Sequence, residues 1–181
     1  MKKLLFLTAA VCMLAAAAFA QDKKGADFSG TWTLDVAKSK LDERMRVESI
    51  KMTVAQTPTE LSVTTETKRP APPADAPVRA GGGGRGGFGA DGKAVYSLEG
   101  KETKLEIDGP NGPIPQALKA KAEGTKLNLS RSMTMSTSGG EITISTKETW
   151  ELSADGKTLT VNRESTSPRG TNTSTLVFSK G

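Results

Sequence analysis

Hydrophobic and polar residues alternate along most of this chain with a period of two. In the stretch ESIKMTVAQ, for example, Ile50, Met52 and Val54 share one face. Such alternation is typical of a strand with one buried face, and the stretches are rich in Thr, Val, Ile and Leu, which favour strands. The pattern predicts about ten short strands, at residues 31–35, 48–56, 60–67, 93–98, 101–107, 116–123, 125–136, 141–153, 157–166 and 171–180.

Short turn sequences separate the expected strands. The turn Thr57-Pro58-Thr59 follows the second strand, and pairs that contain glycine, which favour tight turns, separate the later ones. These pairs are Glu99-Gly100, Glu123-Gly124, Gly139-Gly140, Asp155-Gly156 and Arg169-Gly170. Strands joined in this way form an antiparallel up-and-down meander, and closure into a barrel removes its exposed edges. The predicted fold class is therefore all-β, a closed barrel of about ten antiparallel strands.

Two segments depart from the alternation. The stretch DVAKSKLDERMR, residues 35–46, predicts one or two helical turns. Residues 68–92 are rich in proline and then in glycine, with almost no apolar side chain to bury, so we expect a disordered loop there. Apart from this loop, residues 28–181 are predicted to form a single β-barrel domain.

The loop contains two motifs known from nucleotide-binding proteins. Gly84, Gly86 and Gly89 have the G-x-G-x-x-G spacing, but prolines precede them and a strand follows, whereas a dinucleotide site needs a strand before and a helix N-terminus after. A single RGG unit, Arg85-Gly86-Gly87, is too little for an RNA-binding segment. The loop therefore indicates neither a dinucleotide nor a nucleic acid as a partner.

The N-terminus has the three parts of a secretory signal peptide. Lys2 and Lys3 precede the apolar run LLFLTAAVCMLAAA, and Ala18-Phe19-Ala20 forms a cleavage site of the A-x-A type. We expect a signal peptide at residues 1–20 that is cleaved after Ala20, a flexible N-terminus at 21–27, and a secreted or periplasmic protein. The apolar run is short for a membrane anchor, so the mature protein should have no membrane span. The outward Thr, Ser, Lys and Glu side chains, with 4% aromatic residues, also argue against an outer-membrane barrel.

The composition excludes many kinds of active site. The chain has no histidine, and its one cysteine, Cys12, lies in the signal peptide. This excludes thiol nucleophiles, disulfides, Cys or His zinc sites and imidazole-based triads. No paired-carboxylate site is visible either, so we expect no enzyme, no metal and no cofactor. Without Lys2 and Lys3 there are 23 basic and 20 acidic residues, a net charge of +3, which is too small a surplus to indicate a nucleic-acid-binding face.

Charged residues are expected on the inner face of four neighbouring strands. If the glycine-containing pairs are the turns, the alternation places Arg131 opposite both Gln116 and Glu148, and Glu148 opposite Arg163. One carboxylate between two guanidiniums leaves a surplus inward positive charge. Such a charge is either satisfied within the protein by water and hydroxyls or paired with an acidic ligand. The sequence leaves both interpretations open. Tyr96 should line the same interior.

The first expected strand opens with FSGTW, residues 28–32. Its Gly30-Thr31-Trp32 resembles the G-x-W signature of lipocalins and related calycin barrels. In those proteins the tryptophan plugs the barrel floor and packs against a basic residue from the last strand, and the resemblance assigns these parts to Trp32 and Lys180. The mature chain also resembles small secreted bacterial lipocalin-like proteins of uncharacterised function, through the segments FSGTWTLDVAKS, ETWELSADGKTLTV and SPRG. The resemblance implies a barrel that tends to hold small apolar or amphipathic molecules, and no enzymatic activity comes with it.

These observations predict a secreted or periplasmic barrel that binds a small amphipathic or acidic molecule in its interior. The candidate ligand contacts are Arg131, Arg163, Glu148, Gln116, Tyr96 and Met133. The alternative is a non-catalytic envelope or interaction protein, with a packed barrel and a protein-binding surface, for which the sequence indicates no particular partner. An exposed apolar patch on the outside would favour this alternative.

Overall fold

The computed structural model describes residues 25–42, 45, 47–71, 92–109, 112–137 and 140–181. In these residues the all-β prediction is confirmed, and no helix is present. The strands are β1 (Gly30–Leu34), β2 (Ser49–Gln56), β3 (Glu60–Lys68), β4 (Gly92–Ser97), β5 (Thr103–Gly109), β6 (Gly112–Glu123), β7 (Lys126–Thr137), β8 (Gly140–Leu152), β9 (Thr158–Ser167) and β10 (Gly170–Lys180).

The ten strands form one antiparallel sheet that curls into a nearly closed barrel. The strand order is β4-β3-β2-β1-β10-β9-β8-β7-β6-β5, so the first and last strands of the chain pair in the middle of the sheet. The two ends of the sheet, β4 and β5, contact each other, but no ladder of hydrogen bonds joins them in the described residues. The turn at Glu99-Gly100 therefore connects the two edges of a seam rather than the strands of a hairpin.

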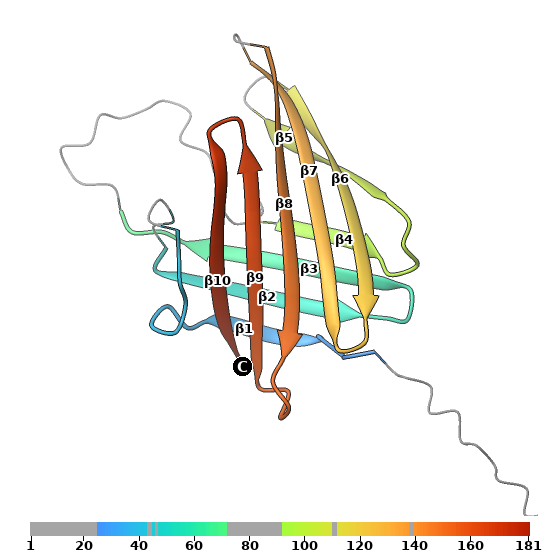
Figure 1. Ribbon diagram of the computed structural model, residues 1–181, viewed down its shortest axis with the longest axis vertical. Helices are drawn as coiled ribbons and strands as arrows, with labels where there is room; N and C mark the ends of the chain where they lie inside the picture. Colours follow the sequence, from blue (N-terminus) through green and yellow to red (C-terminus); the bar gives the residue numbers. More distant parts are fainter. Residues whose placement is uncertain (1–24, 43–44, 46, 72–91, 110–111, 138–139) are drawn as a thin grey trace, which may run out of the picture.

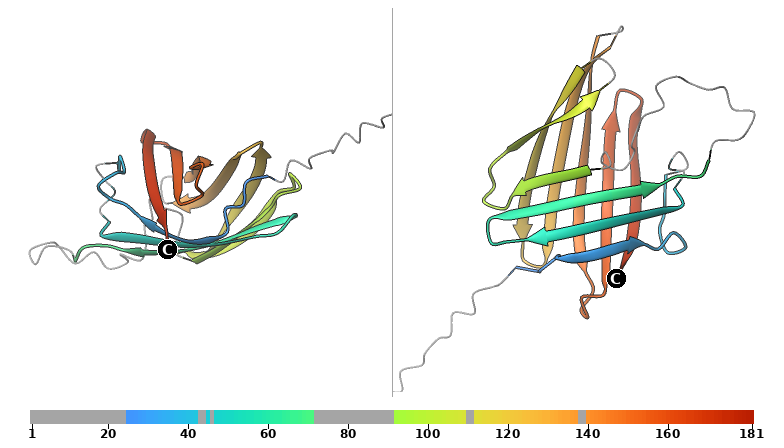
Figure 2. Two further views of the ribbon diagram at one scale, coloured as in Figure 1. Left: turned by 90° about the horizontal axis from the view of Figure 1, so that it is seen from below. Right: turned by 180° about the vertical axis from the view of Figure 1, so that it is seen from behind.

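The barrel is flattened into two curved layers. In Figure 1 β6–β10 lie nearly vertical in front, alternating in direction, and β1–β4 run across behind them. Figure 2 shows the same two layers from below and from behind, with their concave sides facing each other. The upper parts of β6–β8 project beyond the level of β4 (Figure 1), so the two layers face each other over only part of their length.

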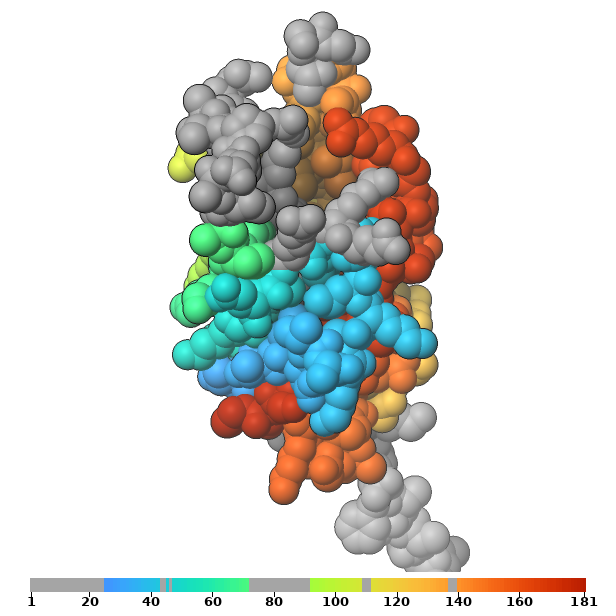
Figure 3. All heavy atoms as spheres, turned by 90° about the vertical axis from the view of Figure 1, so that its left-hand side faces the viewer, coloured from blue at the N-terminus to red at the C-terminus, as the bar shows by residue number. Residues whose placement is uncertain are grey.

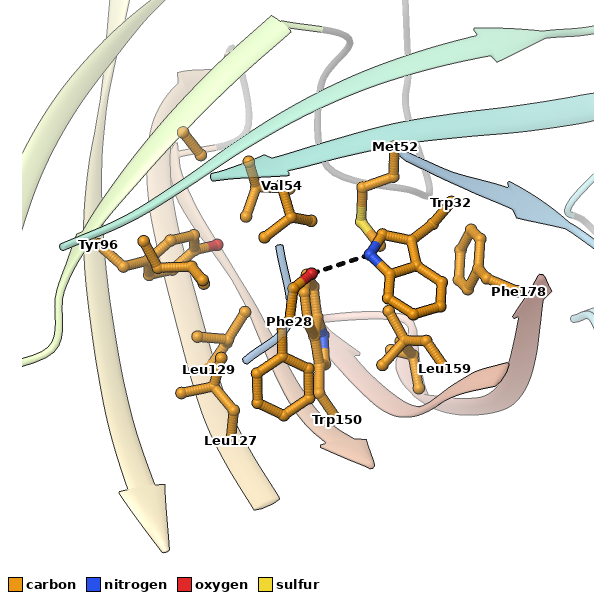
Figure 4. Packing of buried hydrophobic residues seen from close by; sticks show 14 of the residues in the cluster. Phe28, Trp32, Met52, Val54, Tyr96, Leu127, Leu129, Trp150, Leu159 and Phe178 are labelled. Atoms are coloured by element: carbon orange, nitrogen blue, oxygen red, sulfur yellow. Dashed lines mark hydrogen bonds between the residues drawn. The ribbon is translucent and has the colours of Figure 1, made fainter. Parts of the chain in front are cut away.

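Large apolar side chains fill the part of the barrel where the two layers overlap. Trp32, Trp150 and Phe178 are at most 2% exposed, and the rings of Phe28 and Trp150 meet edge to face with centroids 6.0 Å apart. Trp32 Nε1 donates a hydrogen bond to the Phe28 carbonyl oxygen at 2.9 Å, so the polar edge of this indole is satisfied inside the core (Figure 4). Burial of each such side chain stabilises the fold by about 1.5–3 kcal/mol. This core, which we call the apolar floor, lies directly below the polar side chains described in the next section.

The segment after β1 forms turns, and the predicted helical turns at residues 35–46 are absent from its described part. Its backbone instead pairs with β10, since Lys40 and Thr175 exchange two hydrogen bonds and Asp35 N donates to Val177 O at 2.8 Å. Ser39 Oγ, which is bound to the Asp35 carbonyl, also accepts a hydrogen bond from Val177 N. These bonds to a neighbouring strand replace the local bonds of a helix, and they hold the segment against the side of the barrel (Figure 3).

Several sequence predictions concern residues outside the described part. They are the signal peptide at 1–20, the first part of the flexible stretch at 21–27, and most of the loop at 68–92, including its glycine motifs. Within the described part, the chain is already attached to the barrel at Ala26, whose carbonyl accepts a hydrogen bond from Gln56 Nε2 at 3.1 Å. No helix in the described part is long and apolar enough to cross a membrane.

Candidate functional site

The pairing of β8 with β9 brings together the two residues of the predicted charged row that form an ion pair. Glu148 lies directly opposite Arg163, as predicted, and Trp150 lies opposite Val161. The four residues between Ser153 and Thr158 form the turn, centred on Asp155-Gly156, and Ser153 N donates to Thr158 O. This part of the row is confirmed.

The rest of the predicted row is displaced by two residues. Arg131 lies opposite Thr146 on β8 and opposite Leu118 on β6, whereas Glu148 and Gln116 were expected there. The cause is the position of the turns. The last pair before each hairpin turn is Thr137 with Gly140 and Glu123 with Lys126, so Gly140 and Glu123, which were predicted to lie within the turns, are paired strand residues. Each turn is shifted by one residue from its predicted place. A displacement of two residues keeps every side chain on its predicted face, so Arg131 still points inward.

Both carboxylate oxygens of Glu148 accept hydrogen bonds from neighbouring side chains. Its Oε1 accepts hydrogen bonds from Arg163 through Nε at 2.9 Å and through a terminal guanidinium nitrogen, and its Oε2 accepts one from Trp150 Nε1 at 2.7 Å. Burial alone would raise the pKa of this carboxyl, but the attraction of Arg163 and these hydrogen bonds outweigh it and hold the pKa below its usual value. The Glu148–Arg163 pair is therefore charged and mutually neutralised.

Arg131 supplies a second inward positive charge that this pair does not neutralise. The guanidinium donates to the Tyr96 hydroxyl over 3.5 Å, a distance at which a hydrogen bond is weak. No carboxylate of the described residues forms a salt bridge with it. Burial raises the pKa of Tyr96, only partly opposed by the charge of Arg131, so this phenol is neutral at physiological pH. Arg131 also helps to lower the pKa of Glu148 by its charge, and the net charge of Arg131, Glu148 and Arg163 is +1.

A small cavity lies beside these groups. Its volume is about 40 Å³, and its walls combine the polar layer with the upper surface of the core. Because one water-sized group needs about 10–15 Å³ measured in this way, the cavity holds about three, which is the size of a carboxylate group. The lining residues are Met52, Val63, Thr65, Tyr96, Leu129, Arg131, Thr146, Glu148, Trp150 and Arg163.

A second apolar surface, which we call the upper wall, lies beyond the polar layer on the inner face of β5–β8. It contains three cross-strand pairs, which are Ile107 with Ile114, Met133 with Ile144, and Met135 with Ile142. All six side chains are half-buried, and the buried core described above does not include them. The inner face therefore has three levels: an apolar floor, a polar layer with a positive charge, and an apolar wall above it.

The six ligand contacts predicted from sequence have different places in this arrangement. Tyr96, Arg131, Glu148 and Arg163 come together around the cavity. Met133 belongs to the upper wall, and Gln116 lies opposite it on β6. Thr65 and Thr146 also line the cavity. Sequence reasoning did not select them, although the same alternation places both on the inner face.

The contact between Trp32 and Lys180, implied by the lipocalin resemblance, is present. The two residues are direct partners on β1 and β10, and Lys180 Nζ lies 5.1 Å from the centroid of the Trp32 ring. Gly30 has a φ of +136°, which favours glycine, and a Cβ atom there would lie 2.6 Å from Lys180 Cε. Gly30 and Trp32, the first and third residues of the G-x-W motif, therefore both pack against the Lys180 side chain.

The polar layer presents hydrogen-bond donors to the cavity. Arg131 and the hydroxyls around it are hydrogen-bond donors, whereas the carboxylate of Glu148 already accepts from Arg163 and Trp150. Among the described residues, no group of three acidic side chains is arranged to hold a metal ion.

No family model matches the sequence, and no curated protein matches it. Among solved structures, the chain is similar to the crystal structure of zebrafish ileal bile acid-binding protein complexed with cholic acid. The TM-score is 0.48 and the identity 15%, over 85% of this chain and 98% of that one.

Proposed function

We propose that this protein binds a small amphipathic acid inside its barrel, with the anionic group on Arg131 and the apolar part against the upper wall. The observation that supports this most is that Arg131 lines the cavity without a carboxylate partner in the described residues, while Glu148 is occupied by Arg163. Arg131 is half-buried, and an anion in the cavity would form charge-assisted hydrogen bonds with it. Arg131 is therefore the proposed anchor.

The size and charge of the site favour a particular kind of ligand. The cavity of about 40 Å³ has room for a carboxylate but not for a whole amphiphile, so the apolar part has to lie outside it. The half-buried upper wall begins directly beyond Arg131, at Met133. Because the net charge of Arg131, Glu148 and Arg163 is +1, a ligand with one negative charge leaves the interior neutral.

Binding without catalysis is part of the proposal, as is a secreted or periplasmic location, which rests on the predicted signal peptide. The alternative role as a packed interaction protein is favoured by the filled lower core. It is disfavoured by the outer surface, because the only exposed large apolar residue in the described part is Val36, at 41%. A protein-binding patch on the outside usually needs several such residues.

The proposal is tested by titration with three amphiphiles of one chain length: dodecanoate, dodecanol and dodecylamine. Calorimetry reports binding, as does the tryptophan emission, to which Trp150 in the cavity wall contributes together with Trp32. We expect dodecanoate to bind most tightly, and Arg131→Met to weaken it at least about tenfold, since a hydrogen bond to a charged group contributes about 1.5–3 kcal/mol. Arg169→Met is the matched control, because Arg169 is exposed in the turn before β10. Equal binding of all three amphiphiles, or unchanged binding by Arg131→Met, would refute the proposal.

A further inference from the structure

Gln116 has a buried side-chain amide without a hydrogen-bond partner. The residue is 2% exposed, and neither Nε2 nor Oε1 is bonded to any other group in the described residues. A primary amide offers two donors and one acceptor, and a buried polar group left unsatisfied destabilises the folded state. An amide of this kind is satisfied either by a buried water or by a ligand.

The position of Gln116 places it beside the path of the proposed ligand. Leu118 is opposite Arg131, and Gln116, two residues earlier on the same face of β6, is opposite Met133. Gln116 and Arg131 are therefore diagonal neighbours across two strands, at about 7–8 Å between Cα atoms. Gln116 is not among the residues that line the cavity, but a ligand with its anionic group on Arg131 and its chain on Met133 would extend past the position of Gln116 along β6 and β7.

We propose that Gln116 is a specificity-determining residue and that the ligand is a hydroxylated alkanoic acid, with its hydroxyl a few atoms from the carboxylate. A hydroxyl is the smallest group that can both donate to Oε1 and accept from Nε2. An unsubstituted alkanoate, in contrast, would place methylene groups against the amide and leave it unsatisfied. This inference rests on the proposed function, because it requires the anionic group to lie on Arg131.

The inference predicts a preference between two probes that differ by one oxygen atom. The unmutated protein should bind 3-hydroxydodecanoate about tenfold more tightly than dodecanoate, since one satisfied hydrogen bond contributes about 0.5–1.5 kcal/mol and 1.4 kcal/mol is tenfold. Gln116→Met, which keeps the length of the side chain but removes the amide, should bind the two probes equally and should bind dodecanoate at least as well as the unmutated protein.

The outcomes separate this inference from the proposed function. If the unmutated protein binds both probes equally, Gln116 is satisfied by water, so the inference is wrong while the proposed function stands. If Gln116→Met keeps the preference for the hydroxylated probe, another residue forms the hydrogen bond with the hydroxyl, and the assignment of Gln116 is wrong. If neither probe binds, the proposed function fails as well. The comparison on the unmutated protein needs no variant, so it remains decisive if Gln116→Met does not fold.

Discussion

Glu148 and Arg163 face each other on β8 and β9, and Arg163 Nε donates to Glu148 Oε1 at 2.9 Å. The two side chains are 14% and 4% exposed, so the ion pair is largely shielded from water. Removal of one partner would leave the other as a buried charge, whereas removal of both leaves no charge from this pair. The pair itself therefore adds little net stability, but the loss of only one partner is strongly destabilising because the other charge stays buried.

Breaking this pair should be strongly destabilising. We expect Glu148→Leu to lower the free energy of unfolding by about 3–5 kcal/mol, and the double variant Glu148→Leu with Arg163→Met to recover most of the loss. The exposed pair of Lys126 and Glu151 is the control, and Glu151→Leu should cost less than about 1 kcal/mol. Urea unfolding measures these differences. A double variant as unstable as Glu148→Leu would contradict the prediction.

The stability that Glu148 provides should be lost in acid. Its pKa in the folded state is lowered, so its contribution is complete above the unfolded-state value of about 4.3 and disappears as the pH falls through the folded-state value. The difference in unfolding free energy between the unmutated protein and Glu148→Gln should therefore be constant from about pH 7 to pH 5 and shrink below about pH 4. Urea unfolding at a series of pH values measures it. A difference that persists undiminished at the lowest pH would show that the carboxylate is not stabilised by Arg163.

The fold could be predicted from the sequence because local and tertiary signals agree. The alternation in ESIKMTVAQ reflects a strand with one face in the core, and Ile50, Met52 and Val54 are indeed buried. The prediction that the Arg131 side chain faces inward was also correct, because a register shift of two residues leaves a side chain on the same face of the sheet. The segment after β1 was predicted wrongly because its local preference for helical turns is overridden by backbone bonds to β10, which is far away in sequence.

The sequence did not predict which inward side chains lie opposite each other on neighbouring strands. A glycine pair marks a turn but does not fix which two residues occupy its centre, and an error of one residue moves Arg131 from Glu148 to Thr146. Whether Gln116 has a hydrogen-bond partner depends in the same way on which side chains the register brings next to it. Neither the cavity nor the unsatisfied amide therefore has a local signal in the sequence.

Tyr96 provides a direct probe of the charge on Arg131. It is the only tyrosine in the chain, so phenolate absorbance in an alkaline titration reports this residue alone. Burial raises its pKa and the nearby Arg131 charge lowers it, so we expect a value above 10 in the unmutated protein and a still higher one in Arg131→Met. Arg169→Met should leave the value unchanged. A titration in Arg131→Met that matches the unmutated protein would mean that the two groups do not interact.

Gly30 should be required both by its backbone conformation and by Lys180. Alanine at this position would adopt a strained φ of +136°, and its Cβ would displace Lys180 from the Trp32 ring. We expect Gly30→Ala to cost about 1–3 kcal/mol for the backbone and about 0.5–1 kcal/mol more for the lost cation–π contact. Gly170→Ala is the control for the backbone alone, because Gly170 has a φ of +115° and no atom lies near its Cβ position.

A double-variant cycle separates the two contributions of Gly30. In a Lys180→Ala background the Cβ atom introduced by Gly30→Ala has no long side chain to displace, so the cost of Gly30→Ala should fall toward that of Gly170→Ala. Thermal and urea unfolding of the four proteins in the cycle measure the coupling between the two positions. If the cost of Gly30→Ala is the same with and without the lysine side chain, the glycine is required only for its backbone. Lys180 would then play no part in fixing the first residue of the G-x-W motif.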